Sequence, residues 1–361
     1  MSGLQFELET PVPLVDLDIL DRNLAGMARY AAEHGLGLRP HVKTHKAPRV
    51  AREQARLGAV GLSCATTREA EVMASCHHDL LVAHPPVGLK AERLMRLPRE
   101  VDLMVALDSA ESIETLAAAA RRHDRSVRVL VELDLGSHRV GVATAEQAIA
   151  LARLVKERPP LVYAGVSFYP GHIRQRVEEQ QGHLDRLRRD LTAALDTLRG
   201  AGLAPGIVSG GSTPTAWQTH QIEGLTEIRP GTYVYNDRYT VAIGSCARDD
   251  CALTVLATVV STAVPGQAVI DAGSKALGRE PRVEEGQGFG ELLDRPEVTV
   301  KAMNEEHGML DLSRTAWRPA VGDQVRIIPN HACIVTHLND VICGIRGGQV
   351  VERYQVAARG R

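Results

Sequence analysis

Residues 36–46, Leu36-Gly37-Leu38-Arg39-Pro40-His41-Val42-Lys43-Thr44-His45-Lys46, begin as a short apolar run and end in a cluster of cations. Two lysines and two histidines within six residues would repel one another if all were charged and buried, so they are solvated or they bind negative charge. A solvated basic loop is the simpler interpretation. The position favours an anion site, because the run lies at the carboxyl end of the first strand of a strand-helix repeat, where such barrels keep their chemistry.

The repeat extends from this run in both directions. Before it, apolar residues recur at Leu20, Leu24 and Met27 with helical spacing, and Gly35 is placed to end that helix. After it, helices are predicted over 48–57, 110–123, 145–158 and 176–200, with Ser109 as an N-cap and Pro159 beyond a helix end. Strands are predicted over 36–42, 60–65, 80–83, 101–107, 127–133, 162–168, 206–209 and 225–228. Eight strands alternating with helices predict an α/β fold, a (β/α)8 TIM-type barrel, with an open doubly wound sheet as the alternative.

The pattern changes after about residue 244. The remaining chain has β-branched runs separated by turns, predicted as strands over 253–264, 267–272, 297–303, 324–328, 340–345 and 349–356, and Gly347-Gly348 is typical of a hairpin turn. We therefore predict a barrel over 12–244 and a mostly β domain over 245–361 together with 1–11.

Composition excludes several classes of protein. Hydrophobic residues make up 44% and charged residues 24% of the chain, as in ordinary soluble proteins, and the net charge of −2 and 3% aromatics disfavour nucleic acid as a partner. No apolar stretch of about 18 residues and no basic leader is present, so we expect no membrane association and a cytoplasmic location. The six cysteines lack CxxC spacing, which predicts reduced thiols.

Two glycine- and hydroxyl-rich loops follow the last two predicted barrel strands. Ser212 and Thr213 lie in the first, and Gly231, Thr232 and Tyr233 lie in the second. Each loop is also compatible with an ordinary turn. Paired loops at these two positions are, however, the usual phosphate site of a barrel.

His331 and Cys333 stand out in the β domain. In an extended strand the two side chains lie on the same side, so an imidazole and a thiolate can share one cation, for which zinc is the natural candidate. Two protein ligands leave positions open for water or substrate. The alternative is a buried cysteine beside a hydrogen-bonded histidine.

A phosphate site and a lysine at a strand end together suggest pyridoxal phosphate, which needs a phosphate cradle and an amine. Lys43 is the better candidate for that amine, because it belongs to the strand end whereas Lys46 lies beyond it. Arg139, in the loop after the fifth strand, is a candidate contact to the cofactor phenolate, and Tyr169, after the sixth, is a candidate neighbour of its ring.

Five motifs then carry a resemblance: residues 39–46, 210–214, 229–233, 306–308 and 329–333. Together and in this order they resemble the family of D-threonine aldolase and eukaryotic-type D-serine dehydratase, which are fold-type III pyridoxal phosphate enzymes similar to alanine racemase. The resemblance runs from about Thr10 to Gly360. It implies a barrel followed by a β domain, and a homodimer.

The resemblance also implies residue roles. Lys43 would be the Schiff-base lysine, Arg139 the contact to the phenolic oxygen and Tyr169 a ring neighbour. The phosphate would lie on Ser212, Thr213, Gly231, Thr232 and Tyr233, and His331 and Cys333 would hold the metal.

The family divides on chemistry. The His-x-Cys pair and residues 210–215 look like the zinc-dependent dehydratases, whereas the aldolases more often have His-x-Asp with manganese or magnesium. Residues 169–172 and 357–360 look more like the aldolases. We predict a lyase that cleaves D-threonine-like D-3-hydroxy amino acids to glycine and an aldehyde, with His172 and His307 as candidate bases. The alternative is a dehydratase giving a 2-oxo acid and ammonia; less favoured are an amino-acid racemase and a pyridoxal phosphate carrier, of which the carriers lack a β domain.

Overall fold

The computed structural model describes residues 6–280 and 287–360, and within it the chain forms two compact units. The first unit contains the described residues up to Leu24, Thr44–Ala47 and Thr232–Ala357; the second contains Ala25–Lys43, Pro48–Gly231 and the described residues from Ala358 onward. The boundaries predicted from sequence, 12–244 and 245–361 with 1–11, stay a prediction; residues 1–5, 281–286 and 361 lie outside the described part.

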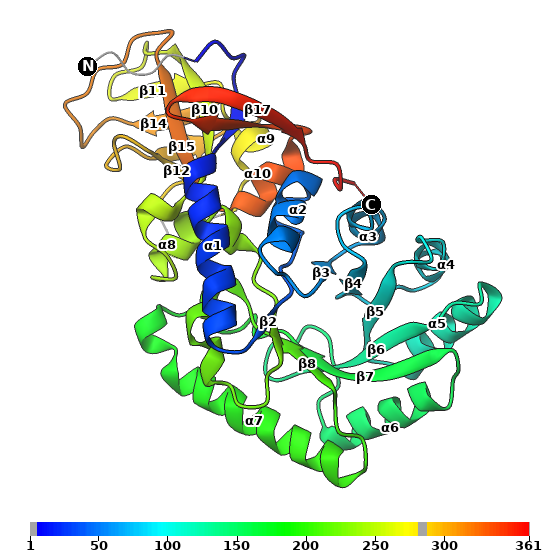
Figure 1. Cartoon of the computed structure of the whole chain (residues 1–361). Helices are drawn as coiled ribbons and strands as arrows, with labels where there is room; N and C mark the ends of the chain where they lie inside the picture. Colours follow the sequence, from blue (N-terminus) through cyan, green and yellow to red (C-terminus); the bar gives the residue numbers. More distant parts are fainter. Residues whose placement is uncertain (1–5, 281–286, 361) are drawn as a thin grey trace. The chain divides into compact units, whose positions relative to one another are not determined.

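The second unit is built on eight parallel strands (Figure 1). Their order is β2-β9-β8-β7-β6-β5-β4-β3, and the two ends of this series are joined where Ser63 N–H donates to Pro40 O and Val42 N–H donates to Ser63 O, both at 2.9 Å. The predicted barrel is thus confirmed. The strands are β2 (Gly37–Leu38), β3 (Leu62–Cys64), β4 (Asp79–Val82), β5 (Asp102–Leu107), β6 (Val127–Leu133), β7 (Leu161–Phe168), β8 (Ile207–Gly210) and β9 (Glu227–Ile228).

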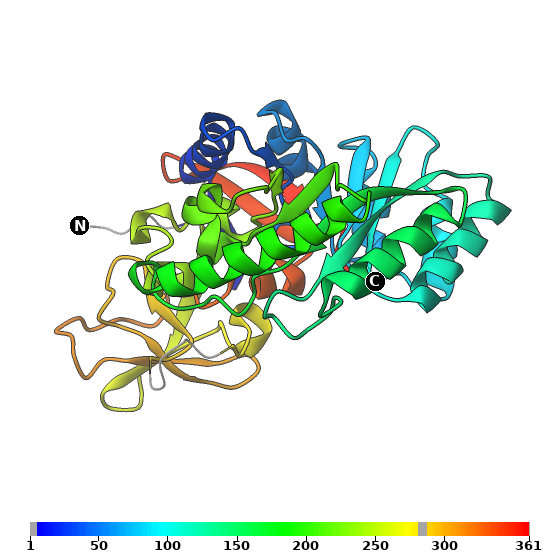
Figure 2. The ribbon, with the colours of Figure 1, turned by 90° about the horizontal axis from the view of Figure 1, so that it is seen from below.

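Helices alternate with these strands, and Figure 2 shows the longest of them, α7, running beside α6. Ser109 caps α5 by accepting from Ser112 N–H, as predicted, and Thr144 forms a capping box with Gln147 at the start of α6. The predicted helix over 176–200 begins later, because Arg176 is extended (φ −56°, ψ 145°) and a 3-10 turn, Val177–Glu179, precedes it. The helices are α1 (Leu17–Glu33), α2 (Pro48–Arg56), α3 (Thr67–Met73), α4 (Leu89–Met95), α5 (Ala110–Arg122), α6 (Ala145–Lys156) and α7 (Gln181–Gly200).

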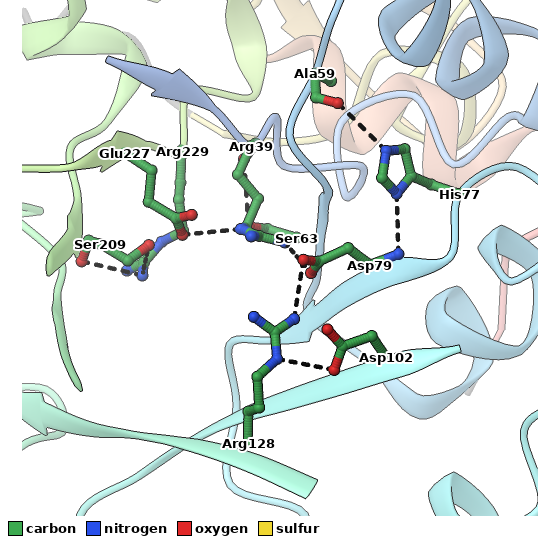
Figure 3. A network of polar contacts seen from close by, with 10 residues as sticks. All are labelled: Arg39, Ala59, Ser63, His77, Asp79, Asp102, Arg128, Ser209, Glu227 and Arg229. Atoms are coloured by element: carbon green, nitrogen blue, oxygen red, sulfur yellow. Dashed lines mark hydrogen bonds and ion pairs between the residues drawn. The ribbon is translucent and has the colours of Figure 1, made fainter. Parts of the chain in front are cut away.

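A network of ion pairs lies near the amino ends of the barrel strands, buried at Arg39 and Glu227 and more exposed at Asp102 (Figure 3). Arg39 donates from Nε to Glu227 at 2.8 Å and from Nη1 to Asp79 at 2.6 Å. Arg128 pairs with the other oxygen of Asp79 at 2.9 Å and with Asp102 at 2.8 Å. Asp79, Asp102 and Glu227 are the first residues of β4, β5 and β9. Each charged side chain of this network is therefore paired with an opposite charge. Apolar side chains form a separate cluster, which contains Leu81, Met104, Ala106 and Leu130.

The first unit is a nine-stranded sheet. Gly347 and Gly348 have φ of 56° and 78° and form the predicted hairpin turn between β16 and β17. The strands are β1 (Val12–Asp16), β10 (Leu253–Ser261), β11 (Gln267–Ile270), β12 (Gly290–Leu292), β13 (Val300–Met303), β14 (Gly308–Asp311), β15 (Gln324–Pro329), β16 (Val341–Arg346) and β17 (Gln349–Gln355). The helices are α8 (Arg238–Ala242), α9 (Ser274–Leu277) and α10 (Ala332–Leu338).

Six of these elements were not predicted from the sequence: β1, β12, β14, α8, α9 and α10. Strand β1 lies between β10, to which it is antiparallel, and β16, to which it is parallel. Helix α10 begins directly after His331, in a stretch that was expected to be extended.

Candidate active site and metal pair

Three predicted cofactor residues meet at the carboxyl end of the barrel. The Lys43 ammonium lies 5.7 Å from the centroid of the Tyr169 ring, and the Arg139 guanidinium carbon lies 4.4 Å from the same centroid. These residues come from the segments after β2, β6 and β7. Gly171 makes room for the arrangement, because a Cβ there would lie 2.1 Å from the Tyr169 ring.

The two cations beside this ring are in no close ion pair with a described carboxylate, although the buried Glu132 interacts electrostatically with Arg139. Within the described part of the chain, neither Lys43 nor Arg139 forms an ion pair or a side-chain hydrogen bond. Two positive groups over one phenol ring make a positive site that an anionic, planar ligand would neutralise.

His172 lies next to the loop after β6. A Cβ on Gly136 would lie 3.1 Å from Cε1 and Nε2 of the His172 ring, so the backbone approaches the imidazole closely. Burial lowers the pKa of His172 below its ordinary value, and the charges of His183 and His138 lower it further. Its Nδ1 is buried without a hydrogen-bond partner among the described residues. A neutral imidazole with an unused ring nitrogen is suited to accept a proton.

The two predicted phosphate loops are hydrogen-bonded to each other and internally. The Gly231 N–H donates to Thr213 Oγ1 at 3.1 Å, and the Ser212 and Thr215 hydroxyls lie 3.1 Å apart. Gly211 has a φ of 88°, a conformation that glycine adopts without strain. Thr232 and Tyr233 follow in the 3-10 turn Thr232–Val234.

Arg229, for which no role was predicted, joins the ends of β7 and β8 by hydrogen bonds. Its Nη2 donates to Phe168 O at 2.8 Å, next to Tyr169, and its Nη1 donates to Ser209 O at 3.2 Å and Ser209 Oγ at 2.9 Å. The sequence carries the arginine but no signal for these backbone partners.

The expectation that His331 and Cys333 share an extended strand is wrong. His331 is extended (φ −143°, ψ 108°), but Cys333 lies in the first turn of α10. The helix forms here because the buried Asp237 carboxylate accepts the Ala332 N–H at 3.0 Å, which satisfies a first-turn donor that has no partner within the helix.

The two side chains nevertheless remain together. Burial opposes protonation of His331, but a hydrogen bond to Cys333, the charge of Cys333 and the charges of Asp237 and Glu280 outweigh it and raise the pKa of His331 to about 10. His331 Nδ1 contacts the Glu280 carboxylate. An imidazole that is oriented by a carboxylate beside a thiol fits a metal ligand pair in chemical type.

His331 and Cys333 belong to no larger group of potential metal ligands among the described residues. Among the described residues, no group of three or more His, Cys, Asp or Glu side chains is placed to hold a metal ion. Two soft protein donors with an orienting carboxylate fit a cation that keeps open positions for other ligands, rather than a closed structural site.

His307 lies in the turn between β13 and β14 and is exposed. Its backbone oxygen accepts from Asn304 N–H at 2.9 Å, but its side chain has no hydrogen bond or ion pair in the part of the chain that the structure describes. The structure therefore partly buries the His172 imidazole and leaves His307 on the surface.

Two hydroxyls close to the Cys333 sulfur were not found from the sequence. Thr44 Oγ1 lies 3.2 Å from Cys333 Sγ, and Thr232 Oγ1 lies 3.8 Å from it. Thr44 follows Lys43 directly in the chain, but nothing in the sequence connects either threonine with a residue near position 333.

Comparison with known proteins identifies the family of the chain. Residues 15–238 match the family model of the alanine racemase N-terminal domain, and residues 252–345 match that of a putative serine dehydratase domain. The chain belongs to the family of the alanine racemase N-terminal domain. The resemblance to D-threonine aldolase and D-serine dehydratase is confirmed.

Relatives with different reactions are similarly close to the chain. D-threo-3-hydroxyaspartate dehydratase from Delftia sp. is 35% identical, over 92% of this chain and 93% of the relative. 3-Hydroxy-D-aspartate aldolase from Paracoccus denitrificans is 33% identical, over 98% of this chain and 93% of the relative. The crystal structure of D-threonine aldolase from Filomicrobium marinum matches with a TM-score of 0.90 at 32% identity, over 98% of this chain and 96% of that chain.

Two solved variants of D-threo-3-hydroxyaspartate dehydratase are also similar to the chain. One replaces a histidine by alanine and the other replaces a cysteine by alanine and is in the metal-free form. They match with TM-scores of 0.89 and 0.88, each at 32% identity over 98% of this chain, and over 96% and 99% of their own. No helix among the described residues is long and apolar enough to cross a membrane.

Proposed function

We propose that this protein is a pyridoxal phosphate- and divalent metal-dependent lyase that cleaves D-3-hydroxy amino acids of the D-threonine type to glycine and an aldehyde. The observation that carries the proposal is the convergence of Lys43 and Arg139 on the Tyr169 ring, where neither cation is in a close ion pair with a described carboxylate. The family and the aldolases among its relatives supply the reaction class.

The barrel residues fit the cofactor in chemical type. Lys43 supplies the amine, Arg139 a cation for the phenolic oxygen, and Tyr169 a flat surface beside the ring. Ser212, Thr213, Gly231, Thr232 and Tyr233 are the proposed phosphate residues, because their hydroxyl and backbone N–H groups are of the type that binds phosphate. When bound, this cofactor takes up the electron pair that bond cleavage leaves on the substrate.

The β unit supplies the metal ligands in the proposal, His331 and Cys333. Zinc suits an imidazole-thiolate pair, and manganese or magnesium are the alternatives known from harder donor sets. A bound divalent cation lowers the pKa of a hydroxyl attached to it. His172 would then accept the hydroxyl proton, because burial and its cationic neighbours keep its imidazole neutral near pH 7. His307 is the second candidate base.

A dehydratase that forms a 2-oxo acid and ammonia is the second candidate function. The observation in its favour is Cys333, together with the Delftia relative and the metal-free cysteine variant of that enzyme. A racemase is less favoured, because it needs no metal pair. We also propose that the protein is a homodimer in solution, as the resemblance implies.

Product analysis tests these proposals. The purified protein is incubated with pyridoxal phosphate, zinc or manganese, and D-threonine or D-serine. Glycine and acetaldehyde from D-threonine are expected for the aldolase, whereas 2-oxobutyrate or pyruvate with ammonia would establish the dehydratase. Accumulation of the L-enantiomer alone would overturn both lyase assignments.

A further inference from the structure

We propose that Thr44 and Thr232 are positioning residues for the metal site, and that their hydroxyls hold the Cys333 sulfur and set its affinity for a divalent cation. The inference rests on the proposed metal pair but adds two residues to it. Both hydroxyls belong to the same compact unit as Cys333.

The Thr44 hydroxyl is the closer of the two. Its Oγ1 lies 3.2 Å from Cys333 Sγ, which is within hydrogen-bond range for sulfur, and Thr44 is fully buried. A buried hydroxyl needs a partner, because a buried polar group without a hydrogen bond destabilises the folded state. The sulfur is therefore part of what satisfies Thr44, and Thr44 in turn provides the donor that a thiolate attracts.

The backbone of Thr44 is fixed to the same helix. Thr336 Oγ1 donates to Thr44 O at 2.5 Å and also contacts the carbonyls of Ala332 and Cys333 at 3.2 and 3.0 Å. Thr44 is thus attached to α10 at two points, by its carbonyl and by its hydroxyl. This leaves the direction of its hydroxyl little freedom.

Thr232 approaches the sulfur from another segment. Its Oγ1 lies 3.8 Å from Cys333 Sγ, at the long end of the range, and the side chain is only half-buried. We expect it to contribute in the same direction as Thr44, but less.

The histidine of the pair is held in a comparable way. Asn330, its neighbour, is buried, accepts from Arg238 Nη1 at 2.6 Å and donates to Glu280 O at 3.0 Å, and Glu280 contacts His331. Each ligand thus has its own support, a carboxylate for the imidazole and hydroxyls for the sulfur. Groups that orient metal ligands in this way typically change metal affinity by about 10–100-fold when they are removed.

Direct metal binding tests the proposal on the full-length protein. The affinity for Zn²⁺ is measured by competition with a chromophoric chelator, and Co²⁺ is used as a spectroscopic probe of the sulfur-to-metal charge-transfer band. We expect Thr44→Val to weaken Zn²⁺ binding by about 10–100-fold and to shift the Co²⁺ band. Thr44→Ser keeps the hydroxyl and is expected to restore both, while Thr232→Val should give a smaller loss.

Thr254→Val is the matched control. Thr254 is also a fully buried threonine of this unit, and its hydroxyl accepts from Arg326 Nε at 3.1 Å. It should leave Zn²⁺ affinity and the Co²⁺ band unchanged. If Thr44→Val folds too poorly to measure, Thr232→Val against Thr254→Val carries the same comparison.

Two outcomes would overturn the inference. Wild-type affinity and an unshifted band in Thr44→Val would show that the hydroxyl does not act on the sulfur. Wild-type affinity in Cys333→Ala would show that the sulfur is no ligand, in which case the metal pair of the proposed function fails as well. If Cys333→Ala loses Zn²⁺ affinity while Thr44→Val and Thr232→Val do not, the metal pair stands and only the role of the two threonines is overturned.

Discussion

Arg39 and Lys43 lie four residues apart in one cationic run, yet their surroundings differ in every respect that matters for charge. Arg39 is almost fully buried and has a carboxylate on two of its nitrogens, Glu227 at 2.8 Å and Asp79 at 2.6 Å. Lys43 is half-buried, lies over the Tyr169 ring, and has no ion pair among the described residues. Arg39, which carboxylates neutralise, therefore supports the barrel, whereas Lys43, which has no ion pair with a described residue, marks where a ligand binds.

Gly61 explains why Arg39 can be buried at all. A Cβ on Gly61 would lie 1.9 Å from Arg39 Nη1, so the guanidinium occupies space that only glycine leaves free. The tolerated size at position 61 is therefore set by the Arg39 guanidinium, together with Asp79 O, from which a Cβ would lie 2.9 Å.

The largest effect is expected at Lys43. Lys43→Ala should remove the visible absorbance of lysine-bound pyridoxal phosphate and lower activity by at least about 10²–10⁴-fold, the contribution of one positioned acid-base group. Absorbance spectra and steady-state rates measure this. Lys46→Ala should keep the band; a band that persists in Lys43→Ala would assign the cofactor to Lys46 and break the comparison.

The second effect concerns stability. Arg39→Met leaves Glu227 buried without its cation, and removal of one partner of a buried pair costs about 3–5 kcal/mol. Denaturant unfolding measures the loss, and the double variant Arg39→Met with Glu227→Gln should recover part of it. Arg199→Ala, which breaks an exposed pair with Asp196, should cost less than about 1 kcal/mol. Equal losses for the two arginines would contradict the structural role of Arg39.

A smaller effect is expected at Arg139. Loss of a hydrogen bond to a charged group costs about 1.5–3 kcal/mol, so Arg139→Ala should weaken cofactor binding about ten- to a hundredfold. Equilibrium titration of the cofactor-free protein measures the affinity. The exposed Arg153 of α6 provides the control, and an affinity equal to that of Arg153→Ala would remove Arg139 from the site.

The smallest effect is a dependence of stability on pH. Burial opposes ionisation of Asp79, but hydrogen bonds and charges from Arg39 and Arg128 outweigh it and hold the pKa of Asp79 below its ordinary value of 3.8. A carboxyl with a lowered folded-state pKa contributes stability that is present above its unfolded-state pKa and is lost as the pH falls through the folded value. Unfolding free energies measured from about pH 5 downward should therefore fall less steeply in Asp79→Asn than in the wild type. Parallel curves would show that Asp79 titrates as it does in the unfolded chain.

The strand-helix alternation was predictable because it depends on local signals. Ser109 caps α5, and Gly347-Gly348 turns a hairpin, as those residue types do in most proteins. Strand β1 was missed because its partners, Leu253 to Leu256 and Cys343 to Ile345, lie more than two hundred residues away and no short-range pattern announces them.

The candidate site was predictable in part for the same reason. Lys43 and Tyr169 follow strands, and the order of strands brings their ends together. The conformation at Cys333 was mispredicted because it depends on Asp237, a buried carboxylate almost a hundred residues earlier that accepts the Ala332 N–H. Arg39 was interpreted with the cations that follow it, because nothing in its own stretch reveals Glu227 and Asp79.

The placement of β1 has a consequence for the order in which the chain acquires its structure. Leu14 of β1 pairs with Cys343 of β16, so a strand that is made early needs a partner strand that is made near the end of synthesis. Chains are made at about 5–20 residues per second, which leaves Leu14 without this neighbour for about 15 to 65 seconds. Until β10 is made, about 12 to 48 seconds after Leu14 at the same rate, β1 has neither of its neighbours and is an apolar segment with unpaired backbone groups, open to pairing with another chain. We therefore expect pairing of β1 with other chains, rather than assembly of the barrel, to limit production of this protein at high concentration.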